Sequence, residues 1–331
     1  MKHGKSCLLL TLFFTLFLFT GCSSSAETKV IRLAILANQN STNGEATLAF
    51  IDEIYKNTGG RYQIEPFFSG ALGQDLTVIE DLQTGTIEVA VVNLSPLSNT
   101  IGELKVMDLP YIIASFEHAD KIFMEGDVGK ELLNLINNYG MHFLGTLELG
   151  FRGLTNSKRE IKGLADIAGL RIRVMENQIQ QELWAALGVD GVPMSMSEAF
   201  TAMQQGAIDG QDNSVVVSYD DRLVEITPYF ALTDQVYSMS PLVLSDAFWN
   251  SLSKEDQAVF ETAGYNLSVF HREITRAARA DRIQRVRDEG GVCTEFSAEV
   301  KQELFAATQP VRDKYAAQFS YWLEKFESLK P

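Results

Sequence analysis

The feature that most restricts the fold of this chain is the alternation of strand-like and helix-like segments in its first third. Residues 30–36 form a short apolar run typical of a buried strand, and 44–57 carry apolar residues at helical spacing. A second strand is predicted at 62–66, a second helix at 76–84 and a third strand at 87–92. This alternation predicts a parallel sheet with helices on both faces.

The same order of elements returns in the middle of the chain. The spacing predicts a short turn or helix over 161–167, a strand over 170–174 and a helix over 178–187. Ser195 and Glu198 have the spacing of a capping box, which indicates the start of another helix. The fold class predicted is therefore α/β.

One internal match bears on the number of lobes. Residues 82–88 and 203–209 agree in residue class at every position, and in each a helix ends at a glycine before a strand. The match has two equally good explanations. In the first, it reflects only a common local arrangement, in which a helix ends at a glycine and a strand follows. In the second, the chain forms two similar lobes, each a doubly wound sheet.

The C-terminal third is predicted to be helical. Ser253 can cap a helix that has acids in its first turn, and the apolar pattern continues to about residue 289, long enough to bridge two lobes. Because acidic residues are interspersed with its arginines, these are expected to form a solvated face and not a nucleic-acid surface. They are Arg272, Arg276, Arg279, Arg282 and Arg285.

The N-terminus indicates export. Lys2 and Lys5 precede an apolar run over 8–20, which is too short to span a bilayer and is typical of a secretory signal peptide. Gly21-Cys22 resembles a lipoprotein processing site, at which Cys22 would be acylated; ordinary cleavage near Ala26 is the alternative. Residues 1–26 are therefore expected to be a signal peptide, and the mature chain periplasmic, with a lipid anchor as its one membrane contact.

Cysteine and charge counts exclude several classes of protein. After export only Cys293 of the three cysteines remains, apart from an acylated Cys22, so no internal disulfide is expected. The net charge is −15, and loss of the signal, with two lysines and no acid, makes the mature chain −17. Because such a surface repels phosphate backbones, no nucleic-acid partner is expected.

Signals for catalysis are mostly absent. The four histidines have no metal-ligand spacing, and the chain has no nucleophile elbow, Walker loop or dinucleotide fingerprint. The adjacent acids Asp220 and Asp221 are expected to be a solvated surface pair. No enzyme activity, metal or cofactor is predicted.

Two arginines in the predicted strand 170–174 are candidates for anion binding. Alternation places Arg171 and Arg173 on one face of the strand, which could be an exposed surface. Arg173, however, lies near the carboxyl end of the strand, where ligands bind in open α/β sheets. Its guanidinium group presents two parallel N–H donors that match a carboxylate.

Many short segments together resemble the DctP family, the solute-binding proteins of TRAP (tripartite ATP-independent periplasmic) transporters. The resemblance covers essentially the whole mature chain. It is carried by residues 72–73, 109–111, 155–159, 166, 169–174, 186–188, 193–194, 197–198, 202–206 and 209–213.

The resemblance implies a set of binding residues. Arg173 matches the family arginine that pairs with the ligand carboxylate, Arg152 matches a second cleft arginine, and Asn213 an asparagine that hydrogen-bonds the same group. Positions expected to line the cleft and to vary with the ligand are Gln74, Asn93, Met196 and Gln235. Ser214 departs from the family, which often has proline there, and could alter the loop beside Asn213.

The resemblance also implies an organisation and a role. Lobe I is expected to comprise residues 27–149 and 240–278, and lobe II residues 150–239 and 279–331, joined by long strands and crossed by one long helix. A monomer of this kind would capture a small organic carboxylate, with sugar acids and C4-dicarboxylates as first expectations, and deliver it to membrane permease subunits. A sensor-type binding protein with the same fold and an exported enzyme acting on small acids are the alternatives.

Overall fold

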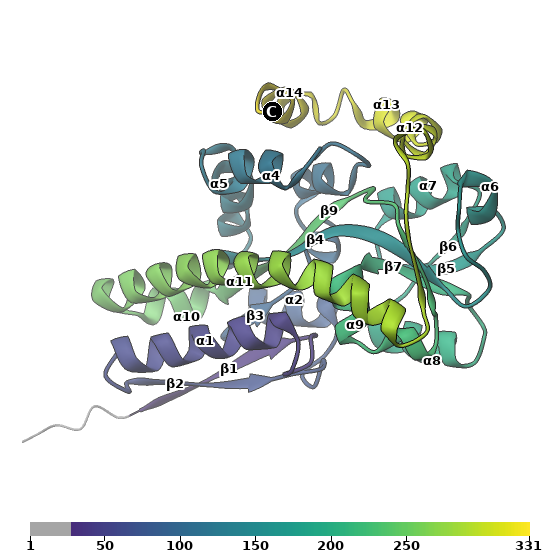
Figure 1. The fold of residues 1–331 in the computed structure, drawn as a ribbon. Helices are drawn as coiled ribbons and strands as arrows, with labels where there is room; N and C mark the ends of the chain where they lie inside the picture. The colour runs from purple at the N-terminus through teal and green to yellow at the C-terminus, as the bar shows by residue number, and fades with distance from the viewer. Residues whose placement is uncertain (1–27) are drawn as a thin grey trace, which may run out of the picture.

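The computed structural model describes residues 28–331 (Figure 1). The predicted signal peptide and Cys22 lie outside the described residues. Within that range, no helix is both long enough and apolar enough to cross a membrane.

The first lobe is built on a mixed sheet in the order β2-β1-β3-β9-β4. β1 pairs in parallel with β2 and β3, whereas β9 pairs antiparallel with β3 and β4. Apolar side chains pack on both faces of this sheet and form two large clusters. The strands are β1 (Lys29–Ile35), β2 (Tyr62–Phe67), β3 (Val89–Val91), β4 (Met141–Asn156) and β9 (Tyr237–Ser245).

The second lobe has its own sheet, in which the end of β4 is flanked by β7, β5 and β6 on one side and by β8 and β10 on the other. β5 runs parallel to β6 and β7. The strands are β5 (Arg171–Val174), β6 (Asp190–Pro193), β7 (Gly210–Ser214), β8 (Tyr229–Leu232) and β10 (Val292–Glu295). The predicted two-lobed α/β fold is confirmed.

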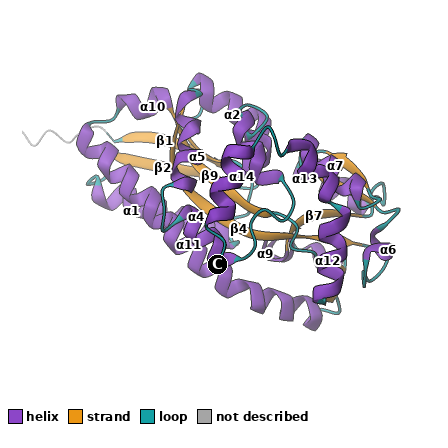
Figure 2. Ribbon diagram, turned by 90° about the horizontal axis from the view of Figure 1, so that it is seen from above, coloured by secondary structure: helices purple, strands orange, loops and turns teal. Residues whose placement is uncertain are grey.

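The helices cover both sheets (Figures 1 and 2). In the first half of the chain they are α1 (Thr42–Asn57), α2 (Asp75–Thr84), α3 (Leu94–Leu97), η1 (Gly102–Asp108), α4 (Phe116–Phe123), α5 (Val128–Leu133), η2 (Asn134–Asn138) and α6 (Leu164–Ile167). Later helices are α7 (Gln178–Ala186), α8 (Met196–Gln204), α9 (Val215–Asp220), η3 (Leu223–Glu225), α10 (Asp246–Ser251), α11 (Lys254–Asp288), α12 (Ala298–Ala307), α13 (Gln309–Tyr315) and α14 (Ser320–Ser328).

The local signals predict most element ends correctly. Ser195 caps α8 with the full capping box, in which the Glu198 side chain returns to the Ser195 backbone. α2 ends at Gly85 in the left-handed conformation, φ 74°, which glycine adopts without strain. The exact division of the chain between lobes stays a prediction, although Trp322 and Phe326 of α14 pack in a core cluster of the first lobe.

β4 is shared by the two sheets. Its first part pairs with β9, and its last residues pair with β7 and β8. The side of β4 near Gly145 has no room for a side chain, because a Cβ there would lie 2.2 Å from the carbonyl oxygen of Gly264 in α11. This close approach fixes α11 against the strand that joins the lobes.

α11 crosses both lobes as predicted, and Figures 1 and 2 show it running along one side of the molecule. Ser253 caps it by accepting a hydrogen bond from the Asp256 backbone N–H. Phe260 and Leu267 pack in the core of the first lobe, and Val286 packs in a cluster of the second.

The arginines of α11 do not form the solvated face that the sequence suggested. Four of the five are mostly buried and pair with acids of other elements, because β4, α4 and the second lobe pack against this side of the helix. The pairs are Arg272 with Asp120, Arg276 with Asp120 and Glu148, Arg279 with Asp234, and Arg282 with Asp220. Arg285 is 54% exposed and pairs within the helix with Asp281.

We predict that Arg276→Met lowers the free energy of unfolding by about 2 kcal/mol, because it leaves the buried Glu148 with fewer donors. Arg276 donates to Glu148 from Nε at 2.7 Å and from Nη2 at 2.8 Å. The measurement is urea unfolding followed by circular dichroism. Arg285→Met on the same helix is the control, with an expected change of at most about 0.5 kcal/mol. Equal losses in the two variants would contradict the prediction.

Candidate functional site: a charged cavity between the lobes

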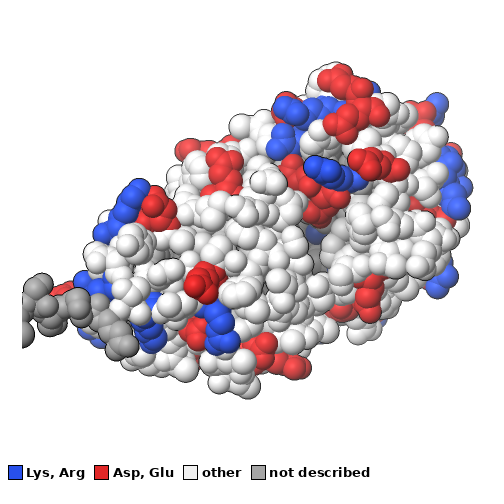
Figure 3. All heavy atoms as spheres, turned by 90° about the horizontal axis from the view of Figure 1, so that it is seen from below, with Lys and Arg blue, Asp and Glu red and all other residues white. Residues whose placement is uncertain are grey.

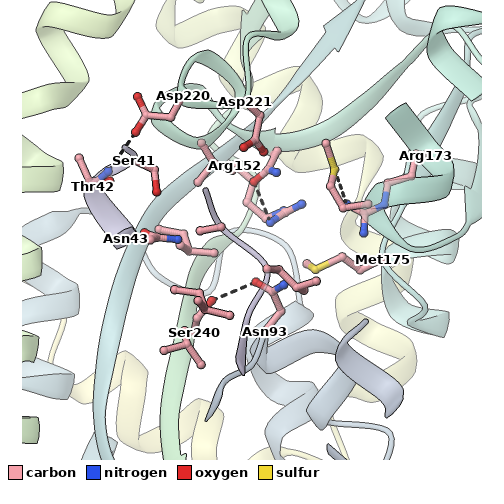
Figure 4. A pocket seen from close by; sticks show the side chains of 18 residues that line it. Ser41, Thr42, Asn43, Asn93, Arg152, Arg173, Met175, Asp220, Asp221 and Ser240 are labelled. Atoms are coloured by element: carbon pink, nitrogen blue, oxygen red, sulfur yellow. Dashed lines mark hydrogen bonds between the residues drawn. The ribbon is translucent and has the colours of Figure 1, made fainter. Parts of the chain in front are cut away.

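A cavity lies where the carboxyl ends of strands from both lobes meet (Figure 4). The first lobe contributes the residues after β1 and β3 together with Ser240 of β9, and the polar groups are Ser41, Thr42, Asn43, Asn93 and Ser240. The second lobe and the joining strand β4 contribute Arg152, Arg173, Met196, Asn213, Asp220 and Asp221. In the space-filling view from below, the molecule is hollowed between its halves, with acidic and basic side chains along one side of the hollow (Figure 3).

Arg173 is buried in the cavity wall although it is charged. It is 4% exposed, and its Nε donates to the carbonyl oxygen of Met194 at 2.8 Å. Its Nη1 lies 3.9 Å from Sδ of Met196, and within residues 28–331 it forms no ion pair with any carboxylate. Burial, together with the nearby charge of Arg152, lowers the pKa of Arg173 to about 10, so it stays protonated at neutral pH.

Arg171 shows why position on the strand matters. It shares a face of β5 with Arg173, yet it is largely exposed and pairs with Asp190 at 3.1 Å on the surface. Of these two arginines, Arg173 alone lines the cavity, because it lies nearer the carboxyl end of β5.

Arg152 has a counter-ion within the protein. Its Nε donates to Oδ1 of Asp212 at 3.0 Å, and both side chains are 1% exposed. Asp212 also accepts hydrogen bonds from Nε1 of Trp184 at 3.1 Å and from Nε2 of Gln235 at 3.0 Å. A buried ion pair requires such additional donors to satisfy the carboxylate oxygens. The remaining Nη1 of Arg152 points toward Oδ1 of Asn213, 3.5 Å away.

Asn213 lies at the end of β7 beside the two arginines. Its Oδ1 accepts from the Ser214 backbone N–H at 2.9 Å and faces Arg152, which leaves the amide N–H groups directed elsewhere. Ser214, where the family resemblance led us to expect proline, caps α9 by accepting a hydrogen bond from the Val217 N–H at 3.3 Å. The departure thus replaces one helix-starting residue by another.

On the first lobe, Asn93 is held in one orientation. The backbone N–H and the Nδ2 of Asn93 each donate to the Asp75 carboxylate at 2.8 Å. The Ser240 hydroxyl donates to Oδ1 of Asn93 at 3.0 Å. Burial raises the pKa of Asp75. Asn43 is fixed from behind by His271 of α11, whose Nε2 lies 2.7 Å from Oδ1 of Asn43. Burial lowers the pKa of His271 to about 3, so its ring is neutral.

Hydrogen bonds join the two lobes beside the cavity. The Asn38 side chain donates to the carbonyl oxygen of Asp220 at 3.1 Å, and the Thr42 N–H donates to the Asp220 carboxylate at 3.2 Å. Asp220 is further paired with Arg282 of α11 at 2.8 Å. These contacts hold the first-lobe loop after β1 against α9 of the second lobe, so the lobes are in contact around the cavity.

A second set of buried hydrogen bonds joins η1 and α3 of the first lobe to α7 of the second. Asn177 donates to Asp108 at 2.8 Å and to Ser98 at 2.9 Å, and Gln180 donates to Asp108 at 3.0 Å. Burial raises the pKa of Asp108 to about 6. All of these side chains are buried, so this part of the interface between the lobes is dry and polar.

The structure brings together most, but not all, of the residues expected from sequence. Arg173, Arg152, Asn213, Asn93 and Met196 all line the cavity.

Two expected lining residues lie elsewhere. Gln235 is fully buried behind the wall, where it donates to Asp212, and so does not face the cavity. Gln74 lies at the start of α2 and lines an outer hollow instead.

Sequence reasoning missed two groups of cavity residues. Asp220 and Asp221, expected to be a solvated pair, line the cavity because the loop after β1 covers them. Ser41, Thr42 and Asn43 also line it. The polar run 38–43, directly after a buried strand, was a signal for them, because ligands bind at the carboxyl ends of strands.

Two α/β lobes around a polar cavity are the architecture of two-lobed ligand-binding proteins. The model of the DctP family, described as bacterial extracellular solute-binding protein, family 7, matches residues 33–318. The chain therefore belongs to this family, as the sequence motifs had suggested.

A related protein and two solved structures are similar to this chain along nearly its whole length. A solute-binding protein of Verminephrobacter eiseniae is 32% identical over 297 residues, covering 90% of this chain and 88% of that protein. The sugar acid binding protein DctPAm of Advenella mimigardefordensis, solved with galactonate, is 28% identical with a TM-score of 0.88, covering 92% of this chain and 99% of that one. A TRAP periplasmic solute-binding protein of Polaromonas sp. JS666, bound to D-erythronate, is 32% identical with a TM-score of 0.87, covering 92% and 100%.

We predict that Asp212→Asn lowers the free energy of unfolding by about 3 kcal/mol, because it leaves the buried Arg152 without its counter-ion. The amide would also place a donor against the donors of Trp184 and Gln235. Urea unfolding is the measurement, with Asp52→Asn as the control, since Asp52 is 59% exposed and forms a surface ion pair with Lys56. A loss no larger than in the control would show that Asp212 does not hold Arg152.

Proposed function

We propose that this chain captures a small organic carboxylate between its lobes, outside the cytoplasm, and delivers it to the membrane permease of a TRAP transporter. The observation that carries the proposal is the guanidinium group of Arg173, which is buried in a cavity between the lobes with no carboxylate partner among the described residues. A buried charge of this kind is unfavourable until a counter-ion binds to it.

In the proposed complex, the ligand carboxylate lies against Arg173 and receives two N–H donors from its guanidinium group. The Nη1 of Arg152 and the side-chain amide of Asn213 lie beside it and are positioned to donate to the same group. Paired donors of this type select a carboxylate over a neutral sugar, because a neutral ligand would leave the buried cation unpaired.

Several of the similar solved structures contain sugar acids. The protein from Advenella mimigardefordensis was solved with galactonate and that from Polaromonas with D-erythronate. Both are hydroxylated monocarboxylates, and the hydroxyl and amide groups of Ser41, Thr42, Asn43, Asn93 and Ser240 suit such a ligand.

Closure of the lobes would link binding to delivery. The hydrogen bonds from Asn38 and Thr42 to Asp220 form only when the lobes meet. A ligand that touches both lobes adds to these contacts and shifts the population toward the closed form. The permease would then recognise the closed form, with an ion gradient and not ATP driving transport, as in the family.

The proposed location of the protein rests on its N-terminal segment. We propose that residues 1–26 direct export and that acylation at Cys22 anchors the mature chain to a membrane. Metabolic labelling with a palmitate analogue should mark the wild type and not Cys22→Ser. Export without label in the wild type would favour cleavage near Ala26.

We predict that Arg173→Ala weakens the binding of galactonate or D-erythronate, whichever the wild type binds, by about 100-fold or more. Arg173→Lys should lose most of the same affinity, because an ammonium group cannot present two parallel donors. Isothermal titration calorimetry measures the effect, after circular dichroism has confirmed that each variant is folded.

The matched control is Arg171→Ala, which removes the neighbouring surface arginine on the same strand and should leave the affinity unchanged. Full affinity in Arg173→Ala would overturn the assignment of Arg173 as the carboxylate anchor. A wild type that binds no organic acid would overturn the proposed function itself.

A further inference from the structure

A ligand with two carboxylates would need two cations in the cavity that are free to pair with it, and the described part of the chain does not provide two. Arg152 is already neutralised by Asp212, with Nε and Oδ1 3.0 Å apart, and both side chains are almost fully buried. Arg173 has no such partner within the described chain. Among the described residues that line the cavity, Arg173 is therefore the one cation without a direct ion pair, which is enough for one carboxylate.

The remaining walls offer no cation for a second carboxylate. The first-lobe wall consists of hydroxyl, amide and apolar side chains. Among the described residues that line the cavity, Arg152 and Arg173 are the only lysine or arginine residues. Two carboxylates, Asp220 and Asp221, complete the second-lobe wall. In Figure 4, Asp220 turns toward Thr42, whereas Asp221 points into the cavity.

The two adjacent acids are in different electrostatic situations. Asp220 is satisfied, because it pairs with Arg282 at 2.8 Å and accepts from the Thr42 N–H at 3.2 Å. Asp221 forms no ion pair among residues 28–331 and has one long hydrogen bond, from Nδ2 of Asn38 at 3.4 Å. Burial raises the pKa of Asp221 to about 6, as expected for a carboxylate that lacks donors.

We infer that the cavity accepts polyhydroxylated monocarboxylates and rejects dicarboxylates, and that Asp221 determines this specificity by accepting a ligand hydroxyl. The inference rests on the proposed function and deepens it, because it decides between the two ligand classes that the sequence left open. A hydroxyl group supplies the donor that Asp221 lacks, in a charge-assisted hydrogen bond. A second carboxylate would instead face a like charge in a buried site, which is strongly unfavourable.

The test compares acids that differ only in the terminal group. Galactonate and galactarate share the same carbon chain and hydroxyl stereochemistry, as do D-erythronate and meso-tartrate, but the second acid of each pair has a carboxylate in place of the terminal CH₂OH. We expect calorimetry at pH 7.5 to show that the wild type binds at least one of the two monocarboxylates. The wild type should bind that acid at least about tenfold more tightly than its dicarboxylate partner.

Asp221→Asn should reduce this preference by about tenfold. It would do so by lowering the affinity for the monocarboxylate, by raising the affinity for the dicarboxylate, or by both. Asp221→Ser, which also removes the charge, is a second variant in case the first does not fold. The matched control is Asp190→Asn on the surface of the same lobe, which should keep the wild-type preference.

The outcomes separate this inference from the proposed function. A wild type that binds none of the four acids and no other acid of a library of small organic acids overturns the proposed function and this inference with it. A wild type that binds malate or succinate but neither monocarboxylate overturns the inference alone. A wild type that binds a dicarboxylate as tightly as its monocarboxylate partner overturns the inference and leaves carboxylate capture standing. An unchanged preference in both folded Asp221 variants overturns the role of Asp221.

Discussion

The candidate site depends on one physical constraint, a buried guanidinium group that forms no ion pair within the described chain. Arg173 is 4% exposed and makes one good hydrogen bond, to the Met194 carbonyl. Burial lowers its pKa to about 10 but leaves it charged at neutral pH, and a buried charge without a paired counter-ion is unfavourable. Arg152 has its own counter-ion, Asp212, so the two arginines differ in role although both face the same cavity.

The same constraint explains why the cavity lies between two lobes. A cation that is buried permanently without a counter-ion would be costly, whereas the proposed movement of the lobes would expose it to water in one state and to the proposed ligand in the other. β4 and α11 connect the lobes, and α11 also fixes cavity residues, through His271 to Asn43 and through Arg282 to Asp220. The long helix is thus positioned to couple the packing of both lobes to the geometry of the site.

Much of the candidate site could be predicted from the sequence, and the predictions that were wrong failed for a common reason. Arg173 was identified from its place at the end of a predicted strand and from the family motifs around it, both of which are local signals. Gln235 was expected in the cleft but faces Asp212, and Asp221 was expected in solvent but faces the cavity. In both cases the surroundings come from distant segments: Asn38 lies 183 residues before Asp221.

By itself, the sequence determined the elements and the available chemistry: the alternation of strands and helices, the caps at Ser195 and Ser253, the length of α11, and an arginine near the end of β5. Tertiary structure alone decided that Arg171 is exposed and Arg173 buried, that Asp212 neutralises Arg152, and that the arginines of α11 form ion pairs with both lobes. The physical reason is range. Caps and helical periodicity act within a few residues, whereas burial and charge pairing depend on segments that only folding brings together.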